Sequence, residues 1–230
     1  MIPLKDDNPT AITPVVTIGL IAVNIIVFLY QWSLGPNGEQ DFVFAFGATP
    51  AALFGGQAVS SIPPSLTLIS SMFIHGGIMH IAGNMLYLWI FGDNIEDVMG
   101  HGRFIVFYLL CGVAAAYAHA VTAPSSGVPM IGASGAISGV LGSYLVLFPR
   151  ARVLTLVPLG FFTQFVHVPA SVMLGLWIVI QFVNGTFGLS GTGGGIAWFA
   201  HVGGFVTGMI FIRFFVRRPS FPQNSRRDEA

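Results

Sequence analysis

The stretch PMIGASGAISGVLGSYLVLFPRARV, residues 129–153, places a serine between glycines at the start of an otherwise apolar segment. Positions 131–148 carry no charged side chain and are numerous enough to cross most of a bilayer as a helix, which takes about 20 residues. Charged residues return only at Arg150 and Arg152. The stretch therefore predicts a membrane-spanning helix with the hydroxyl of Ser134 at its start.

The whole chain has the composition of a membrane protein. Of its 230 residues, 54% are hydrophobic and 8% are charged, against roughly 25% charged in an average soluble protein. The formal net charge is zero, which gives no electrostatic footprint for nucleic acid. We predict an all-α membrane protein with six transmembrane helices, at about 14–32, 73–92, 104–121, 131–148, 167–184 and 196–215. The first apolar run is interpreted as a retained span, because it lacks a small-residue cleavage site.

The positive charges predict the orientation of these spans. All nine Lys and Arg residues lie in or next to segments that would share one side of the membrane, which are 1–13, 93–103, 149–166 and 216–230. The opposite loops, 33–72, 122–130 and 185–195, contain none. The positive-inside tendency then predicts a multi-pass protein of the cell membrane with both termini in the cytoplasm.

The same pattern predicts the domain organisation. We expect a cytoplasmic N-terminal segment at 1–13, a six-helix domain at 14–216 and a polar cytoplasmic tail at 217–230. The apolar loop 33–72 is expected to lie partly in the membrane interface, and the apolar stretch TLVPLGFFTQFVHVP, 155–169, along the inner surface. The glycine-rich loop 185–195 is expected to be mobile.

Four polar side chains inside the predicted spans are candidates for chemistry, because such groups are costly in lipid. They are His80, Asn84, Ser134 and His201. Three of them precede a charged residue by sixteen positions, as the pairs His80/Glu96, Ser134/Arg150 and His201/Arg217 show. Sixteen residues of helix are about 24 Å, so the three groups should lie at one depth below the outer surface.

These side chains make up the parts of an acyl-transfer site. Ser134 begins a helix, where the first backbone N–H groups lack intrahelical partners and can hold an oxyanion. His201 is the candidate general base, and His80 and Asn84 are candidate donors to the same developing charge. No Asp or Glu lies in any predicted span, so the chemistry that remains is a Ser-His dyad. We expect neither a metal nor a cofactor, since no H-E-x-x-H motif is present.

Each feature also has a structural interpretation. A GxSxG pattern is common in packing motifs, a single intramembrane histidine is often structural, and Asn84 could simply link helices. Small residues at Ala197, Gly204 and Gly208 share a helix face with His201, which predicts close packing against the glycines that follow Ser134. Three other histidines are interpreted as structural residues: His75, His119 and His167. His101 is interpreted as a surface residue.

In combination, these motifs resemble those of the rhomboid intramembrane serine proteases. The resemblance rests on HGGIMHIAGNM (75–85), GDNIEDVMGHGRF (92–104), GASGA (132–136) and AHVGGFVTG (200–208), and it covers nearly the whole chain. It implies a six-helix rhomboid-like bundle whose fifth helix and last outer loop move to admit substrate. It also implies Ser134 as nucleophile, His201 as base, and His80, Asn84 and the Ser134 amide as the oxyanion hole.

The resemblance implies an intramembrane serine endopeptidase that acts on transmembrane protein substrates within the lipid bilayer. The alternative is a non-proteolytic rhomboid-like protein that binds or escorts membrane helices. Two features depart from some family members: Ser138 stands where an aromatic residue packs on the histidine, and the first outer loop lacks a Trp-Arg pair. The histidine must therefore be oriented in another way. The sequence specifies neither the natural substrate nor the oligomeric state.

Overall fold

The computed structural model describes residues 1–56, 60–159, 162–188 and 197–217, and this part of the chain is mostly helical. The helices are α1 (Val15–Ser33), α2 (Gly35–Phe46), α3 (Pro50–Leu53), α4 (Pro64–Ser70), the 3-10 turn η1 (Ser71–Phe73), α5 (Ile78–Met99), α6 (His101–Thr122), α7 (Ser134–Leu147), α8 (Ala170–Gly188) and α9 (Trp198–Phe215). The strands are β1 (Ile2–Asp6), β2 (Arg152–Leu159) and β3 (Phe162–Pro169). The predicted tail beyond residue 217 and most of the glycine-rich loop 185–195 lie outside the described residues.

The long helices form the bundle of a multi-pass membrane protein. Within the described ranges, α1, α6, α8 and α9 are each long and apolar enough to cross a membrane alone. The pair formed by α4–η1 and α5 is bent by 84° and would supply a fifth crossing, whereas α7, with 14 residues, is shorter. Large apolar side chains such as Leu29, Val179 and Phe214 are more than half exposed, as expected for a surface that contacts lipid. The all-α membrane fold is therefore confirmed. Four helices of the described residues, or five with the bent pair, are long and apolar enough to cross, and the six-helix count stays a prediction.

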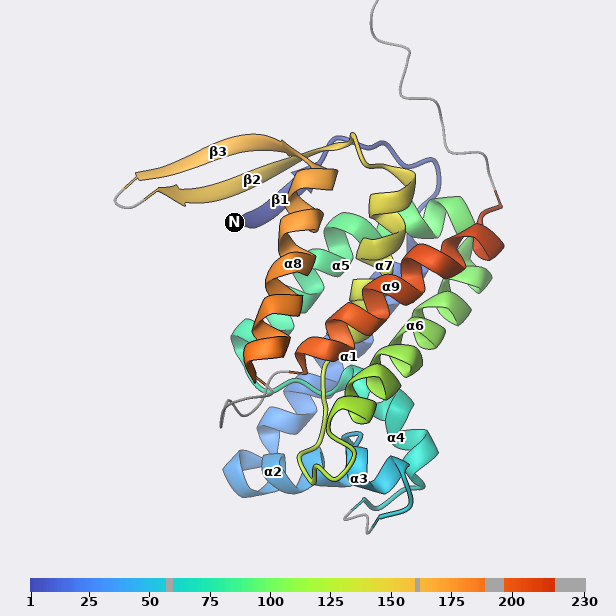
Figure 1. Ribbon diagram of the computed structural model, residues 1–230, viewed down its shortest axis with the longest axis vertical. Coiled ribbons are helices and arrows are strands. Elements are labelled where there is room, and N and C mark those ends of the chain that lie inside the picture. The colour runs from blue at the N-terminus through green and yellow to red at the C-terminus, as the bar shows by residue number, and fades with distance from the viewer. Residues whose placement is uncertain (57–59, 160–161, 189–196, 218–230) are drawn as a thin grey trace, which may run out of the picture.

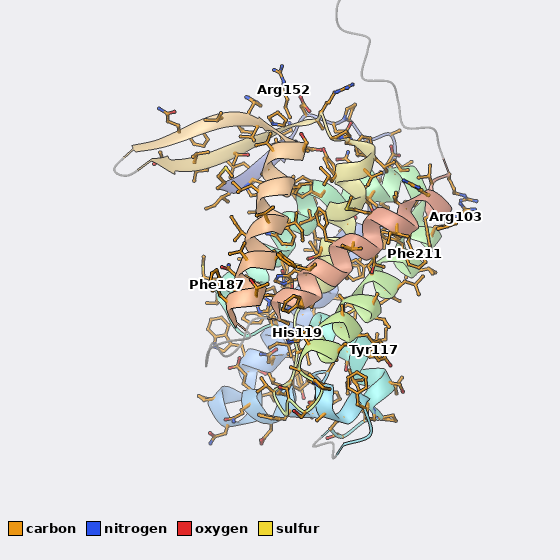
Figure 2. All side chains as sticks on the ribbon, viewed as in Figure 1. Arg103, Tyr117, His119, Arg152, Phe187 and Phe211 are labelled. Atoms are coloured by element: carbon orange, nitrogen blue, oxygen red, sulfur yellow. The ribbon has the colours of Figure 1, made fainter. Side chains whose placement is uncertain are left out.

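Helix α7 lies at the centre of the bundle and contacts α5, α6, α8 and α9. Its residues from Gly135 to Tyr144 are all buried. The sheet lies at one end of the bundle and the short helices α2, α3 and α4 lie at the other (Figure 1). We call the first the charged end, because Arg103 and Arg152 lie toward it (Figure 2). We call the second the site end, because α7 begins toward it with Ser134 (Figure 1).

The predicted close contact between the serine helix and the histidine helix is confirmed. A Cβ atom added at Gly204 would collide with the carbonyl oxygen of Gly135, and one added at Gly208 would collide with that of Gly139. Ser143 Oγ also donates across this contact to the carbonyl oxygen of Gly208, at 3.1 Å. Only glycine lets the two backbones approach this closely, because any side chain would occupy the space of the facing peptide group.

A three-stranded antiparallel sheet at the charged end was not predicted. Strand β1 pairs with β2, and β2 pairs with β3, so that the N-terminal residues lie beside a hairpin about 150 positions further along the chain (Figure 1). Val153 and Thr155 on alternate positions of β2 are fully buried against the bundle. Most of the apolar stretch 155–169 therefore belongs to this sheet, in which its backbone groups have hydrogen-bond partners. Its position along the inner membrane surface stays a prediction.

Helix α5, which carries His80 and Asn84, extends further along the chain than the predicted second span. It continues to Met99, so that Asp93, Glu96 and Asp97 lie on its last turns. The Glu96 carboxylate is fully buried and accepts hydrogen bonds from the backbone N–H groups of Val16 and Thr17, at 2.9 and 2.8 Å. These are first-turn amides of α1, which have no intrahelical partners. Glu96 therefore caps α1 from another helix.

The segment predicted as the first outer loop, 33–72, contains helices α2, α3 and α4 at the site end. It is tied to the segment that leads into α7, since Ala48 and Met130 form a bridge and Ala51 N–H donates to the Ser126 carbonyl. The loop thereby helps to fix the chain just before Ser134.

Candidate active site

Ser134 is the first residue of α7, and the turn before it depends on a glycine. Gly132 has φ of +115°, a conformation that side chains disfavour, and a Cβ there would lie 2.7 Å from His80 Nε2. The Gly132 N–H donates to the Ser71 carbonyl at 2.9 Å, which fixes the turn. The chain can therefore pass directly against His80 and then start a helix with a hydroxyl at its first position.

His201 lies on the first turn of α9 and meets Ser134 across the glycine contact. His201 Nε2 and Ser134 Oγ are 2.8 Å apart, a hydrogen-bond distance. Both residues are half-buried, so the pair is accessible without being on the surface. The structure brings together the two side chains that the sequence assigned to nucleophile and base, from separate helices.

The other ring nitrogen of His201 is held by a residue that the sequence analysis missed. Gln181 Oε1, on α8, lies 2.7 Å from His201 Nδ1, and the Gln181 side chain is 7% exposed. An amide oxygen only accepts, so Nδ1 carries a proton and Nε2 of the neutral ring is free to accept from the serine hydroxyl. The signal in the sequence was a polar residue inside the predicted span 167–184. The sequence does not show which other helix this residue faces, so its contact with His201 was missed.

Two tryptophans contact the imidazole. The Trp177 ring, one turn before Gln181, lies 5.9 Å from the His201 ring at an interplanar angle of 36°, and the Trp198 ring lies 6.2 Å away, edge-on. Ser138 instead donates to the Ser134 carbonyl at 2.6 Å and does not contact the histidine by any hydrogen bond in the described structure. The orientation of His201, which the sequence left open at Ser138, thus comes from α8 and the start of α9.

His80 and Asn84 lie on one face of α5, beside Gly132. The Gly76 N–H donates to His80 Nδ1 at 3.3 Å, so that in the neutral ring Nε2 carries the proton and is a donor. The Asn84 amide nitrogen is buried without a hydrogen-bond partner, and it would lie 3.6 Å from a Cβ at Gly132. Two N–H donors therefore border the turn that precedes Ser134.

The loop before α5 is fixed by a second buried glutamine that the sequence analysis did not identify. Gln31, on α1, donates to the His75 carbonyl at 2.7 Å and accepts from the His75 N–H at 3.3 Å. It also donates to Glu39 Oε1 of α2 at 2.9 Å. The His75 ring is fully buried and packs edge-on against His80, with centroids 5.1 Å apart. The structural interpretation of His75 agrees with this packing.

Three histidines remain besides those already described. His101 is exposed, as the surface interpretation predicted, and its Nδ1 is 2.6 Å from Glu96 Oε1 at the charged end. His167 is exposed on β3, and His119 lies on the last turn of α6. Among the residues that the structure describes, no three His, Cys, Asp or Glu side chains are close enough to hold a metal ion.

The comparisons with known proteins agree with this architecture. Residues 64–218, more than half of the chain, match the Rhomboid domain. The chain belongs to the rhomboid family. This rhomboid is 33% identical to Rhomboid protease GluP of Bacillus subtilis over 147 residues, which are 64% of this chain and 27% of that protein.

Two mitochondrial relatives are similarly close. The human Presenilin-associated rhomboid-like protein, mitochondrial, is 33% identical over 147 residues, which are 63% of this chain and 36% of that protein. Rhomboid protein 1, mitochondrial, of Saccharomyces cerevisiae is 29% identical over 176 residues, which are 74% of this chain and 47% of that protein. This rhomboid thus matches less than half the length of each of the three relatives.

Proposed function

We propose that this rhomboid is an intramembrane serine endopeptidase that hydrolyses peptide bonds in or near the transmembrane segments of other membrane proteins. The observation that carries the proposal is the 2.8 Å contact between Ser134 Oγ and His201 Nε2, with Nδ1 of the same ring held by Gln181. A hydroxyl becomes a nucleophile when an adjacent base accepts its proton, and the base must be held in the correct tautomer.

In the proposed reaction, Ser134 Oγ attacks a substrate carbonyl carbon while its proton passes to His201 Nε2. The tetrahedral intermediate collapses to an acyl-enzyme when His201 returns the proton to the leaving amine. A water molecule, activated by His201 in the same way, then releases the second product and restores the serine. No step requires a cofactor.

We assign the oxyanion hole to His80, Asn84 and the backbone amide of Ser134. His80 Nε2–H and the Asn84 amide border Gly132, and first-turn amides of α7 lack intrahelical partners. Donors that are already oriented before charge develops stabilise a transition state at no further reorganisation cost. The unpaired Asn84 nitrogen supports this role, since a buried donor without a partner is costly unless a ligand uses it.

The membrane environment explains the type of substrate. A helical segment hides its carbonyl groups in hydrogen bonds, so a substrate must unwind locally before its carbonyl reaches Ser134. We further propose that 14–216 is the protease domain, flanked by cytoplasmic segments at 1–13 and 217–230. The distribution of Lys and Arg favours a cell membrane with both termini cytoplasmic.

The first experiment tests the nucleophile. The purified full chain in detergent is exposed to a fluorophosphonate serine-hydrolase probe. Wild type should be labelled and Ser134→Ala should not. Ser143→Ala is the matched control, since this serine lies on the same helix with its hydroxyl bonded to two carbonyls. Equal labelling of wild type and Ser134→Ala would exclude Ser134 as nucleophile.

The second experiment tests proteolysis. A reporter with a Gly-rich transmembrane segment is incorporated with the enzyme into liposomes, and cleavage is followed on gels. Wild type should cleave it, and His201→Ala should not while keeping its melting temperature within a few degrees. Capture of the reporter by wild type without cleavage would instead support the non-proteolytic helix-binding alternative.

A further inference from the structure

Helix α8 reaches His201 with two side chains one helical turn apart. Trp177 and Gln181 differ by four positions, so they lie on the same face, and that face meets α9. Gly185, one turn further along, packs against Trp198 and Phe199 of α9, where a Cβ would come within 3.2 Å of either side chain. The stripe formed by these three α8 residues brings the helix close enough to α9 for an amide to reach the imidazole.

The Gln181 contact determines the tautomer and the orientation of the His201 ring. If Nδ1 lacked an acceptor, the neutral ring could carry its proton on either nitrogen and could rotate about its side-chain bonds. A proton on Nε2 would place a donor against the Ser134 hydroxyl and would prevent His201 from accepting the hydroxyl proton. The acceptor oxygen at 2.7 Å from Nδ1 disfavours both the wrong tautomer and the rotation of the ring.

An amide is suited to this position for an electrostatic reason. The Gln181 side chain is almost fully buried on α8, which packs against α9, and an ionised carboxylate in its place would be costly. The neutral amide oxygen accepts from Nδ1–H both before and after His201 takes the serine proton. It therefore orients the ring throughout the reaction without a buried charge.

We infer that Gln181 is a positioning residue for the proposed reaction, because it holds His201 in the tautomer that accepts the Ser134 proton. The packing of α8 against α9 is then a condition of catalysis. The inference rests on the proposed protease function. It adds a third side chain to the Ser134–His201 pair and assigns to α8 a role in the chemical step.

The test compares three variants of the full chain in liposomes. Gln181→Met keeps the length of the side chain and removes the acceptor. Gln181→Glu keeps an acceptor oxygen at the same length, on a carboxyl group that burial favours in its neutral form. Val179→Met places the same methionine on the exposed face of α8. For each we measure kcat and KM on the transmembrane reporter, the fluorophosphonate labelling rate and the melting temperature. Loss of orientation should lower kcat of Gln181→Met by about 10- to 100-fold.

The pattern across measurements separates positioning from other roles. We expect KM of Gln181→Met within about twofold of wild type, a matching fall in labelling rate, and recovery of most of the activity in Gln181→Glu, with Val179→Met unchanged. A raised KM with unchanged kcat would overturn the inference, because Gln181 would then act in substrate admission. Unchanged kinetics of Gln181→Met would overturn it as well, while leaving the proposed protease intact if Ser134→Ala is inactive.

A spectroscopic measurement does not depend on any Gln181 variant being folded. In the ¹⁵N spectrum of histidine-labelled wild type, the His201 signals are those missing in His201→Ala. They should report a neutral ring with the proton on Nδ1, and a ring protonated on Nε2 alone would overturn the inference. Absence of both labelling and cleavage in wild type would instead reject the proposed function itself.

Discussion

Two buried polar side chains of α5, near opposite ends of the bundle, differ in whether their hydrogen-bonding groups have partners. Glu96, at the charged end, accepts hydrogen bonds from two backbone amides and from the Thr17 hydroxyl, and it also contacts His101. Asn84, three turns earlier and near the site end, has an amide nitrogen with no hydrogen-bond partner. Both are at most 8% exposed. One side chain is satisfied within the protein, and the other keeps a donor free.

The difference follows from what each contact stabilises. A carboxylate that meets first-turn amides stabilises the native state, because it satisfies donors and interacts favourably with the helix dipole. A buried donor without a partner costs stability, and the cost is recovered only when a ligand or a developing charge accepts from it. Glu96 is therefore expected to act on folding, and Asn84 on the proposed reaction.

The largest effect is expected from Asn84→Ala. Loss of one proposed oxyanion donor should lower kcat by about 100- to 1,000-fold, while the free energy of unfolding changes by less than about 1 kcal/mol, because the removed amide nitrogen was unpaired. Cleavage of the reporter and thermal unfolding in detergent measure the two effects.

Asn24→Ala is the matched control, since that buried asparagine of α1 uses its amide nitrogen in a 2.7 Å bond to the Leu20 carbonyl. It should lose stability and keep kcat. A normal kcat in Asn84→Ala would remove the contrast between the two ends of α5.

The next effect concerns Glu96→Gln. One oxygen becomes an NH₂ group, which cannot accept from the α1 amides or from Thr17, so two donors at most remain satisfied. The free energy of unfolding should fall by about 2–3 kcal/mol, with kcat unchanged at temperatures well below the melting point. The exposed Asp41→Asn is the control, expected within about 0.5 kcal/mol of wild type. Unchanged stability of Glu96→Gln would show that the cap on α1 contributes nothing.

The smallest effect is a pH dependence at the charged end, where Asp6 of β1 accepts a hydrogen bond from the Tyr144 hydroxyl of α7. Burial raises the pKa of Asp6 from 3.8 to about 6, although the bond from Tyr144 opposes the rise. The native state then binds more protons than the unfolded chain between about pH 4 and pH 6, so the Asp6 contribution to stability falls as pH rises through that window.

Comparison with Asp6→Asn isolates this contribution. The melting temperature of wild type, relative to that of Asp6→Asn, should fall between pH 4 and pH 6 and stay level above about pH 7. The exposed Asp41→Asn should follow wild type at every pH. A constant difference between wild type and Asp6→Asn would show that Asp6 titrates alike in the folded and unfolded chains.

Much of the fold is predictable from local pattern. Apolar runs between charge clusters locate α1, α6, α8 and α9 within a few residues, because a span of lipid imposes its length on each run. The small-residue stripe around Gly204 and Gly208 predicts the contact with α7, since a glycine face in lipid indicates close backbones. The family follows from the motifs that surround Ser134 and His201.

Other features depend on pairs that no local pattern specifies. Strand β1 pairs with β2 far along the chain, Glu96 accepts hydrogen bonds from the start of α1, and Gln181 forms a hydrogen bond with His201. In each case polar groups, of the backbone or of a side chain, are matched to a partner from a distant segment, and the sequence contains many equivalent polar groups. Gln31 and Gln181 look alike in the sequence, yet one holds a loop backbone and the other an imidazole.

The sequence by itself determined which segments are apolar, which small residues share a face and which side chains have the chemistry for acyl transfer, because these properties belong to individual residues and their spacing. Only the tertiary structure decided which donors are satisfied, which stay free and what orients His201. Hydrogen bonds act over about 3 Å, and which groups come that close is set by the packing of whole helices.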